Sequence, residues 1–196
     1  LYADNLEIIG EKGSMINGCD CFDELGEEYY RGPHAIDMSY CTNIRLSGYT
    51  VINSANWAHS ILYCKNIDVE NVEVRAGHDG VHFTCCDNIR VTDCCFYTGD
   101  DCVAGFDNVN MMVTGCECNT ACSAFRLGGT NVFITKCHIW GPAKYTFRGA
   151  LSDEEKRSGI TNSSNIGKRY NMLSVFTYTL MFISLNTEMY SASCTQ

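Results

Sequence analysis

Residues 66–74 read NIDVENVEV, and this pattern recurs along most of the chain. The copies start at Asn43, Asn66, Asn88, Asn110 and Asn131. Their asparagines are 23, 22, 22 and 21 residues apart, and the segment NLEIIGEKG from Asn5 resembles an earlier copy after which extra residues are inserted. In each of the five copies the residues one and three positions after the asparagine are apolar. This is the two-residue period of a β-strand.

A repeat of about 22 residues predicts an all-β fold, the right-handed parallel β-helix, in which each copy forms one coil. It is shorter than a propeller blade or a tetratricopeptide unit, and it lacks the leucines of a leucine-rich repeat. Equivalent strands would lie about 4.8 Å apart. The asparagines suit turns, because asparagine tolerates a left-handed backbone and stacked asparagine side chains bond to each other.

The repeat also divides the chain. We expect β-helix coils over residues 1–150 and, over residues 151–196, a short helix or loop and a C-terminal tail, with an incomplete further coil as one interpretation of that tail. The helix is expected because SDEE (residues 152–155) has the form of a capping box. Beyond about Tyr178 the repeat fades. Open β-helix ends expose strand edges and apolar interior, so self-association through them is expected.

Six of the 14 cysteines fall in register with the repeat. Three lie six residues after their asparagine (Cys94, Cys116 and Cys137), and three lie two residues before it (Cys41, Cys64 and Cys86). We interpret both sets as stacks of small side chains in the coil interior, and metal sites and disulfides remain the alternatives. Many buried thiols favour a reducing, cytoplasmic compartment. Secretion is the alternative if a signal peptide lies outside this sequence.

The acidic net charge of the chain argues against two classes of binding partner. The formal net charge of −9 argues against nucleic acid and against an anionic membrane, because both are bound by basic surfaces. The longest apolar stretch, residues 172–185, is too short to span a bilayer comfortably. An acidic ligand remains compatible with the composition, since a local basic cluster is enough to bind one.

Two aspartates and a serine share one place in the repeat. Asp79, Asp101 and Ser123 are 22 residues apart, and each precedes an apolar strand position, so we expect them to stack on adjacent coils. Asp100 lies beside Asp101, and a bend at Gly99 is expected to turn both carboxylates outward. Three carboxylates so close together repel one another, which is unusual in a merely structural turn.

The stretch from Arg31 to Val74, followed by HDGV and GDDCVA, resembles the polygalacturonase family of pectin-cleaving glycoside hydrolases, family 28, over roughly residues 1–148. The resemblance implies a parallel β-helix, a polysaccharide or oligosaccharide substrate with uronate or rhamnose, and neither cofactor nor metal. It implies that Asp100 is the general acid and that Asp79 and Asp101 activate water. Inversion would need the acid and the base about 6.5–9.5 Å apart.

Two departures from the family pattern concern the histidine that supports catalysis in the family and the residues that bind the substrate carboxylate. Ser123 stands where the family has the histidine of Gly-His-Gly, and the family's Arg-Ile-Lys is reduced to Arg148 without a following lysine. Arg126 is expected to point to the same side as the carboxylates, and His78 neighbours Asp79. We therefore expect Ser123, Arg126, Arg148 and His78 to bind substrate. The other histidines are expected to be rim or packing residues: His34, His59, His82 and His138.

Three functions follow. The first is a hydrolase of a pectin-type or other uronate- or rhamnose-containing polysaccharide, which the aspartates favour. The second is a catalytically inactive carbohydrate-binding β-helix, which Ser123 and the missing lysine favour. The third and least favoured is a polysaccharide lyase, which would usually need calcium and a basic residue.

Overall fold

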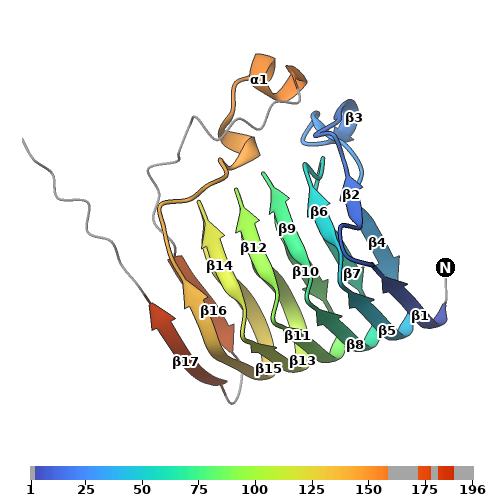
Figure 1. Cartoon of the computed structure of the whole chain (residues 1–196), viewed down its shortest axis with the longest axis vertical. Coiled ribbons are helices and arrows are strands. Elements are labelled where there is room, and N and C mark those ends of the chain that lie inside the picture. The colour runs from blue at the N-terminus through green and yellow to red at the C-terminus, as the bar shows by residue number, and fades with distance from the viewer. Residues whose placement is uncertain (1–2, 159–171, 178–180, 188–196) are drawn as a thin grey trace, which may run out of the picture.

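The structure is a computed structural model that describes residues 3–158, 172–177 and 181–187. Its strands wind into a solenoid of about five coils, each of about 22 residues (Figure 1). Sixteen strands belong to one continuous sheet, and the strand pairs along the solenoid are parallel. The predicted all-β parallel β-helix is therefore confirmed.

Each complete coil contributes to three faces, on which equivalent strands stack. The first face comprises β4 (Ile36–Ser39), β7 (His59–Leu62), β10 (Val81–Thr84), the start of β13 (Val103–Thr114), the start of β15 (Ser123–Ile139) and β16 (Met172–Thr177). The second comprises β1 (Asp4–Ile9), β5 (Thr42–Ser47), β8 (Lys65–Glu70), β11 (Asp87–Thr92), the later parts of β13 and β15, and β17 (Met181–Thr187). The third comprises β2 (Met15–Asn17), β6 (Thr50–Ile52), β9 (Glu73–Ala76), β12 (Cys95–Thr98), β14 (Glu117–Thr120) and the end of β15.

The asparagine register is observed on the second face. Ile44 pairs with Ile67, Ile67 with Ile89 and Ile89 with Met111, and all four side chains are buried in the core. The asparagine that precedes each of these positions has a left-handed backbone, with φ between 54° and 59°. Side-chain amides bond from coil to coil, as between Asn88 Nδ2 and Asn66 Oδ1 at 2.8 Å. Asn110 breaks this ladder, because its Nδ2 donates to Asp87 Oδ1.

The two cysteine stacks also lie where the register predicts them, inside the coils. The backbone N–H of Cys41 donates to the Sγ of Cys64 at 3.3 Å, and the N–H of Cys64 donates to the Sγ of Cys86 at 3.4 Å. In the next coil Asn108 takes the place of a cysteine, and its Oδ1 accepts the N–H of Cys86 at 3.0 Å. The 13 cysteines in the described part of the chain are free thiols. Core stacking is confirmed, whereas the redox state in solution stays a prediction.

The segment after β15 carries the predicted helix and further strands. Helix α1 (Asp153–Ser158) starts with the predicted capping box, in which Ser152 and Glu155 exchange hydrogen bonds. Strand β16 pairs with the start of β15 and β17 with its later part, both in parallel, so the ladder continues beyond the asparagine repeat. Among the described residues, no helix is long and apolar enough to cross a membrane. The division at residue 150 stays a prediction.

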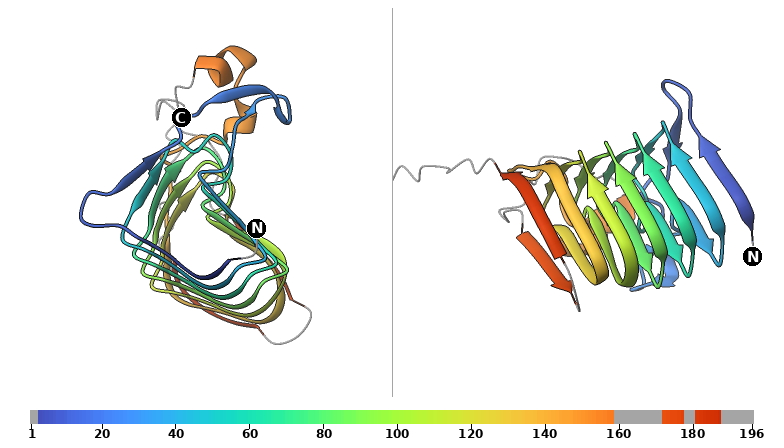
Figure 2. Two further views of the ribbon diagram at one scale, coloured as in Figure 1. Left: turned by 90° about the vertical axis from the view of Figure 1, so that its right-hand side faces the viewer. Right: turned by 90° about the horizontal axis from the view of Figure 1, so that it is seen from below.

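Residues 145–158, which include the short helix η1 (Arg148–Ala150), pack against the loop that carries β3 (Phe22–Glu27), as Figure 2 shows. Arg148 Nη1 lies 2.7 Å from Asp20 Oδ1 in a buried ion pair. Lys156 Nζ lies 4.6 Å from the centroid of the Tyr30 ring. The early loop and the late segment therefore form one structural unit at the edge of the first face.

Candidate active site

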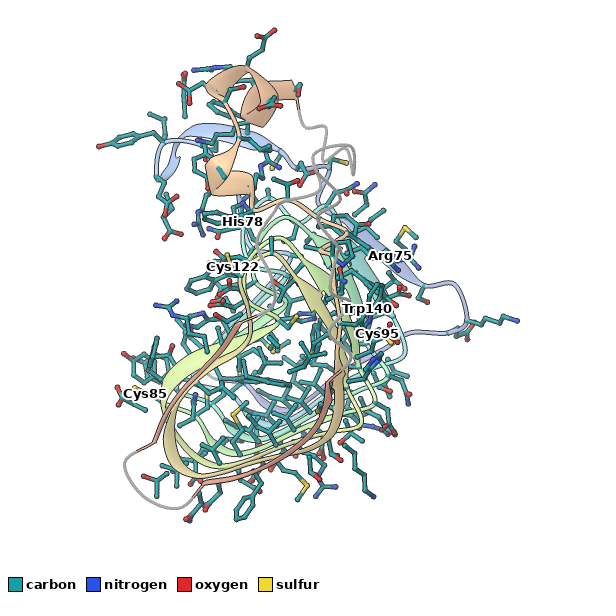
Figure 3. All side chains as sticks on the ribbon, turned by 90° about the vertical axis from the view of Figure 1, so that its left-hand side faces the viewer. Arg75, His78, Cys85, Cys95, Cys122 and Trp140 are labelled. Atoms are coloured by element: carbon teal, nitrogen blue, oxygen red, sulfur yellow. The ribbon has the colours of Figure 1, made fainter. Side chains whose placement is uncertain are left out.

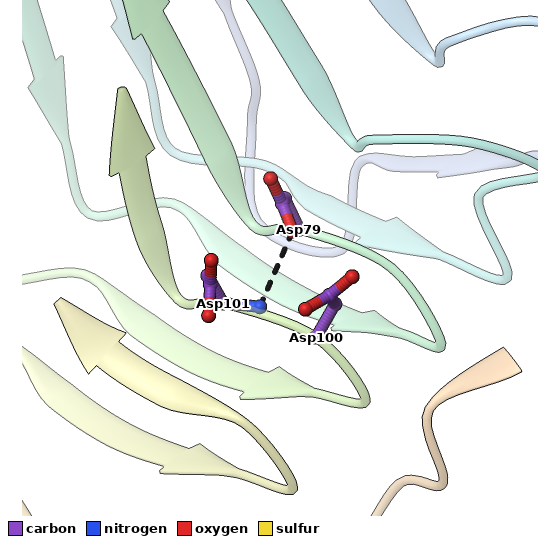
Figure 4. A group of neighbouring side chains, drawn as sticks. All are labelled: Asp79, Asp100 and Asp101. Carbon is purple, nitrogen blue, oxygen red and sulfur yellow. Dashed lines mark hydrogen bonds between the residues drawn. The ribbon is translucent and has the colours of Figure 1, made fainter. Parts of the chain in front are cut away.

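Asp79, Asp100 and Asp101 come together at the start of the first face (Figure 4). One oxygen of each carboxylate lies within 4.8 Å of one oxygen of the other two. The backbone N–H of Asp101 donates to Asp79 Oδ1 at 3.2 Å, and the N–H of Ser123 donates to Asp101 Oδ1 at 3.0 Å. Asp79 and Asp101 thus each accept a backbone N–H from the next coil, as the 22-residue stacking predicts.

The reason for Gly99 differs from the expected one. Its backbone is not left-handed, so the glycine does not supply a bend that other residues resist. A Cβ at this position would instead collide with the carbonyl oxygen of Thr146 and would lie 2.7 Å from that of Gly77. Gly99 makes room for the segment after β15, whose backbone approaches it closely at Thr146. Asp79 and Asp101 are each only 3 % exposed, and Asp100 is half-buried.

Burial and mutual repulsion raise the pKa of all three carboxyl groups. Burial raises the pKa of Asp100 to about 6, with the negative charge of Asp79 as the second cause. Burial is also the main cause of the raised pKa values of Asp79 and Asp101, and each carboxyl group is further raised by a neighbouring aspartate. The cluster therefore favours keeping at least one proton.

Fixed donors distinguish the three carboxylates. Besides its amide bond, Asp79 contacts the Nδ1 of His82 through Oδ2 at 3.0 Å. Asp101 contacts the Nη1 of Arg126 through Oδ2 at 3.5 Å. These donors favour the charged forms. Asp100 is held mainly through its backbone, since its carbonyl oxygen accepts the hydroxyls of Thr98 and Thr120.

Of the predicted binding residues, the structure brings Ser123 and Arg126 to the carboxylates. Ser123 is 7 % exposed and lies one coil beyond Asp101. The Arg126 side chain is 50 % exposed, and its guanidinium lies 5.2 Å from the centroid of the Phe106 ring. Arg126 is thus the predicted basic residue that combines exposure with contact to the cluster.

Arg148 and His78, both expected to bind substrate, are buried in the structure. Arg148 is 1 % exposed, and its guanidinium binds Asp20 and the carbonyl oxygen of Lys156, so it holds two segments together. His78 is fully buried beneath the segment that contains Arg148 (Figure 3) and stacks with Tyr30 at 6.0 Å. Burial, with the charge of Arg31 next, lowers the pKa of His78 to about 2. Neither side chain is exposed for contact with a substrate.

His82, expected to be a rim or packing residue, belongs to the site. Its ring contacts Asp79 and stacks on Trp57 at 3.9 Å with an interplanar angle of 4°, and His34 stacks on Trp57 at 5.1 Å. The repeat indicates this position for His82, because strand pairing places His82 beside Ala104 and Ala104 beside Arg126. The three residues therefore share one outward row, which includes the arginine of the site. His59 agrees with the packing prediction: its ring is buried against Tyr49.

Two further features concern ligands. The three aspartates are spaced so that they could hold a metal ion, although acidic clusters are common without one.

A groove of about 730 Å³ runs along the outer side of the second face, lined by the asparagine ladder and by Arg45, Asp68 and Arg90. None of the three aspartates lines this groove.

Inversion at the sugar stays a prediction. The 4.8 Å limit concerns one oxygen of each carboxylate, whereas the 6.5–9.5 Å typical of inverting enzymes is the separation between the acid and base carboxyl groups. Any assignment of the stereochemical course therefore rests on family membership.

The family model for glycosyl hydrolases family 28 matches residues 4–122, more than half of the chain. The chain belongs to glycosyl hydrolases family 28. The match includes Asp79, Asp100 and Asp101 but ends before Ser123, Arg126 and Arg148. The aspartates thus lie inside the family-like region, and the residues that depart from the family pattern lie beyond it.

Curated relatives of this family 28 chain are plant proteins. It is 33% identical over 84 residues to "Probable polygalacturonase" of Vitis vinifera, covering 40% of this chain and 17% of the relative. It is 29% identical over 152 residues to "Polygalacturonase ADPG1" of Arabidopsis thaliana, covering 70% and 35%. It is 26% identical over 120 residues to "Polygalacturonase" of Nicotiana tabacum, covering 54% and 30%. The matches therefore span only about a sixth to a third of these relatives' lengths, and no solved structure matches the chain.

Proposed function

We propose that this chain is part of a glycoside hydrolase that cleaves a pectin-type or other uronate- or rhamnose-containing polysaccharide. Asp100 is the general acid, and Asp79 and Asp101 hold and activate the attacking water. The observation that carries this division of labour is the unequal distribution of donors. Burial raises the pKa of all three carboxyl groups, that of Asp100 to about 6, but within the described part of the chain only the Asp79 and Asp101 carboxylates accept a backbone N–H and contact His82 or Arg126.

This arrangement suits acid catalysis of glycoside cleavage. A carboxyl group with a pKa near 6 retains its proton in a weakly acidic medium and releases it readily to the leaving oxygen. The amide bonds and the nearby His82 and Arg126 stabilise the other two carboxylates in the ionised form that accepts a proton from water. Inversion at the sugar is proposed from family membership.

Arg126 is proposed to bind the acidic group of the sugar. A guanidinium binds a carboxylate through two parallel hydrogen bonds, and this one is half exposed above the aspartates. The names of the plant relatives, which contain "polygalacturonase", support an acidic substrate. No cofactor is proposed.

A second candidate is an inactive carbohydrate-binding β-helix. Two observations favour it: Ser123 stands where the family pattern has a histidine, and Arg148 is buried in a structural ion pair. The fold and the aspartates would then serve binding alone.

Product analysis separates these functions. The chain would be incubated with oligogalacturonides, rhamnogalacturonan fragments and neutral xylo-oligosaccharides, with mass spectrometry for products and NMR for the first anomer formed. Hydrolysis of an acidic oligosaccharide, with inversion, is the expected result. An unsaturated product would identify a lyase, and binding without cleavage would identify the inactive module.

The compartment and the oligomeric state stay predictions. Buried thiols favour the cytoplasm, and secretion is the alternative if a signal peptide lies outside this sequence. Self-association through the coil ends is tested by light scattering across a range of protein concentrations.

A further inference from the structure

Cys122 occupies the place beside Ser123 that Asp100 occupies beside Asp101, because the coil spacing is 22 residues. The N–H of Cys102 donates to the carbonyl oxygen of Ser123 at 3.0 Å, and the N–H of Ser123 donates back to Asp101 Oδ1. These bonds fix the two coils in register. They place Cys122 next to Asp100. Figure 3 shows Cys122 on the side of the coils opposite Cys95 and Trp140.

One hydroxyl ties Cys122 and Asp100 together more closely. The Oγ1 of Thr120 accepts the backbone N–H of Cys122 at 3.0 Å and donates to the carbonyl oxygen of Asp100. The Oγ1 of Thr98 donates to the same carbonyl at 2.7 Å. These bonds hold the backbones of Cys122 and Asp100 together, and hydrogen bonding from the Cys122 side chain lowers the pKa of the Asp100 carboxyl.

We propose that Cys122 is a positioning residue for Asp100, holding the carboxylate beneath the next coil through a thiol hydrogen bond. This inference rests on the proposed role of Asp100 as general acid. A thiol is a weak donor, so it orients the carboxylate while stabilising its charged form only slightly. A strong donor at this position would favour loss of the proton that the acid must keep.

Several charged groups also face Asp100. Asp79 raises the pKa of the Asp100 carboxyl, and Arg31 and Arg126 lower it, as does the bond from Cys122. Asp101 lies beside it. Removing the thiol while keeping these groups isolates its contribution, so Cys122→Ala is the informative change.

The test measures the Asp100 pKa directly by NMR titration of ¹³C-labelled aspartate carboxyls, with the signal assigned through Asp100→Asn. Cys122→Ala should raise the Asp100 pKa by about 0.4 to 1 unit, the equivalent of one hydrogen bond. Cys122→Ser should return it to the wild-type value or below, since a hydroxyl is the better donor. Cys95→Ala is the matched control, because Cys95 is partly buried but lies on the other side of the coil (Figure 3).

A second measurement serves if Cys122→Ala does not fold. The negative charge of Asp100 should disfavour the Cys122 thiolate, which is the form that reacts with iodoacetamide. Asp100→Asn should therefore speed alkylation of Cys122, and peptide mass spectrometry measures the rate. An unchanged Asp100 titration in Cys122→Ala, or an unchanged alkylation rate in Asp100→Asn, would overturn the inference. A shifted titration in a chain that cleaves no substrate would support the contact and refute the hydrolase proposal.

Discussion

Replacement of Arg148 by methionine should destabilise the fold. The Arg148 side chain is 1 % exposed, its Nη1 lies 2.7 Å from Asp20 Oδ1, and its Nη2 donates to the carbonyl oxygens of Asp20 and Lys156. Methionine fills a similar volume but leaves the Asp20 carboxylate buried without its partner. Breaking a buried ion pair in this way costs about 3–5 kcal/mol of unfolding free energy.

Urea denaturation followed by circular dichroism gives the measurement. With a slope of about 2–3 kcal/mol per molar urea, the midpoint should fall by about 1 to 2.5 M. Arg126→Met is the matched control and should cost at most about 1 kcal/mol, because its ion pair with Asp101 is half exposed. Combining Arg148→Met with Asp20→Asn should recover part of the loss, since the unpaired charge is then removed. An Arg148→Met variant as stable as wild type, yet unable to bind acidic oligosaccharides, would refute the structural role and make Arg148 a ligand.

Three further results are expected. Arg126→Ala should weaken binding of an acidic oligosaccharide about tenfold or more in calorimetry, the equivalent of one charge-assisted pair, while a neutral one binds as before; equal losses would mean that Arg126 contributes shape alone. Thiol titration under denaturing conditions should recover nearly all 14 cysteines, without stoichiometric zinc in elemental analysis; two or more disulfides would contradict the reduced stacks. Asn88→Ala should lower the unfolding free energy by about 1–3 kcal/mol, because alanine resists the φ of 59° and breaks the ladder, and Asn88→Gly should cost less. Equal costs for the two Asn88 variants would argue against backbone strain.

The repeat was sufficient to predict both the fold and the meeting of the aspartates. A fixed spacing of asparagines sets the register, and the register places Asp79, Asp101 and Ser123 on successive coils. The same register pairs His82, through Ala104, with the row of Arg126, so the contact of His82 with Asp79 was available in principle. Sequence alone places His82 among the packing residues, because a strand histidine on its own more often packs than takes part in a site.

Contacts made outside the repeat were not predictable in this way. Arg148 and His78 face the early loop and the late segment, whose packing depends on contacts between residues more than 100 positions apart, such as Arg148 and Asp20. The role of Gly99 depends on the same packing, because the neighbour that excludes a side chain is Thr146. The asparagine repeat does not extend to strand β17, yet this strand pairs with β15 in parallel. Parallel pairing is made by backbone hydrogen bonds and needs no particular side chain, so the repeat does not predict it.

The most direct test of the proposed acid is the pH dependence of turnover in wild type and Asp100→Asn. Wild-type kcat on the best acidic oligosaccharide should fall as the pH rises through about 6, because Asp100 then loses the proton it must donate. Asp100→Asn keeps the shape but removes that proton, so kcat should drop by roughly 10²–10⁴ with circular dichroism unchanged. A folded Asp100→Asn variant that cleaves the substrate as fast as wild type, with the same fall near pH 6, would contradict the account.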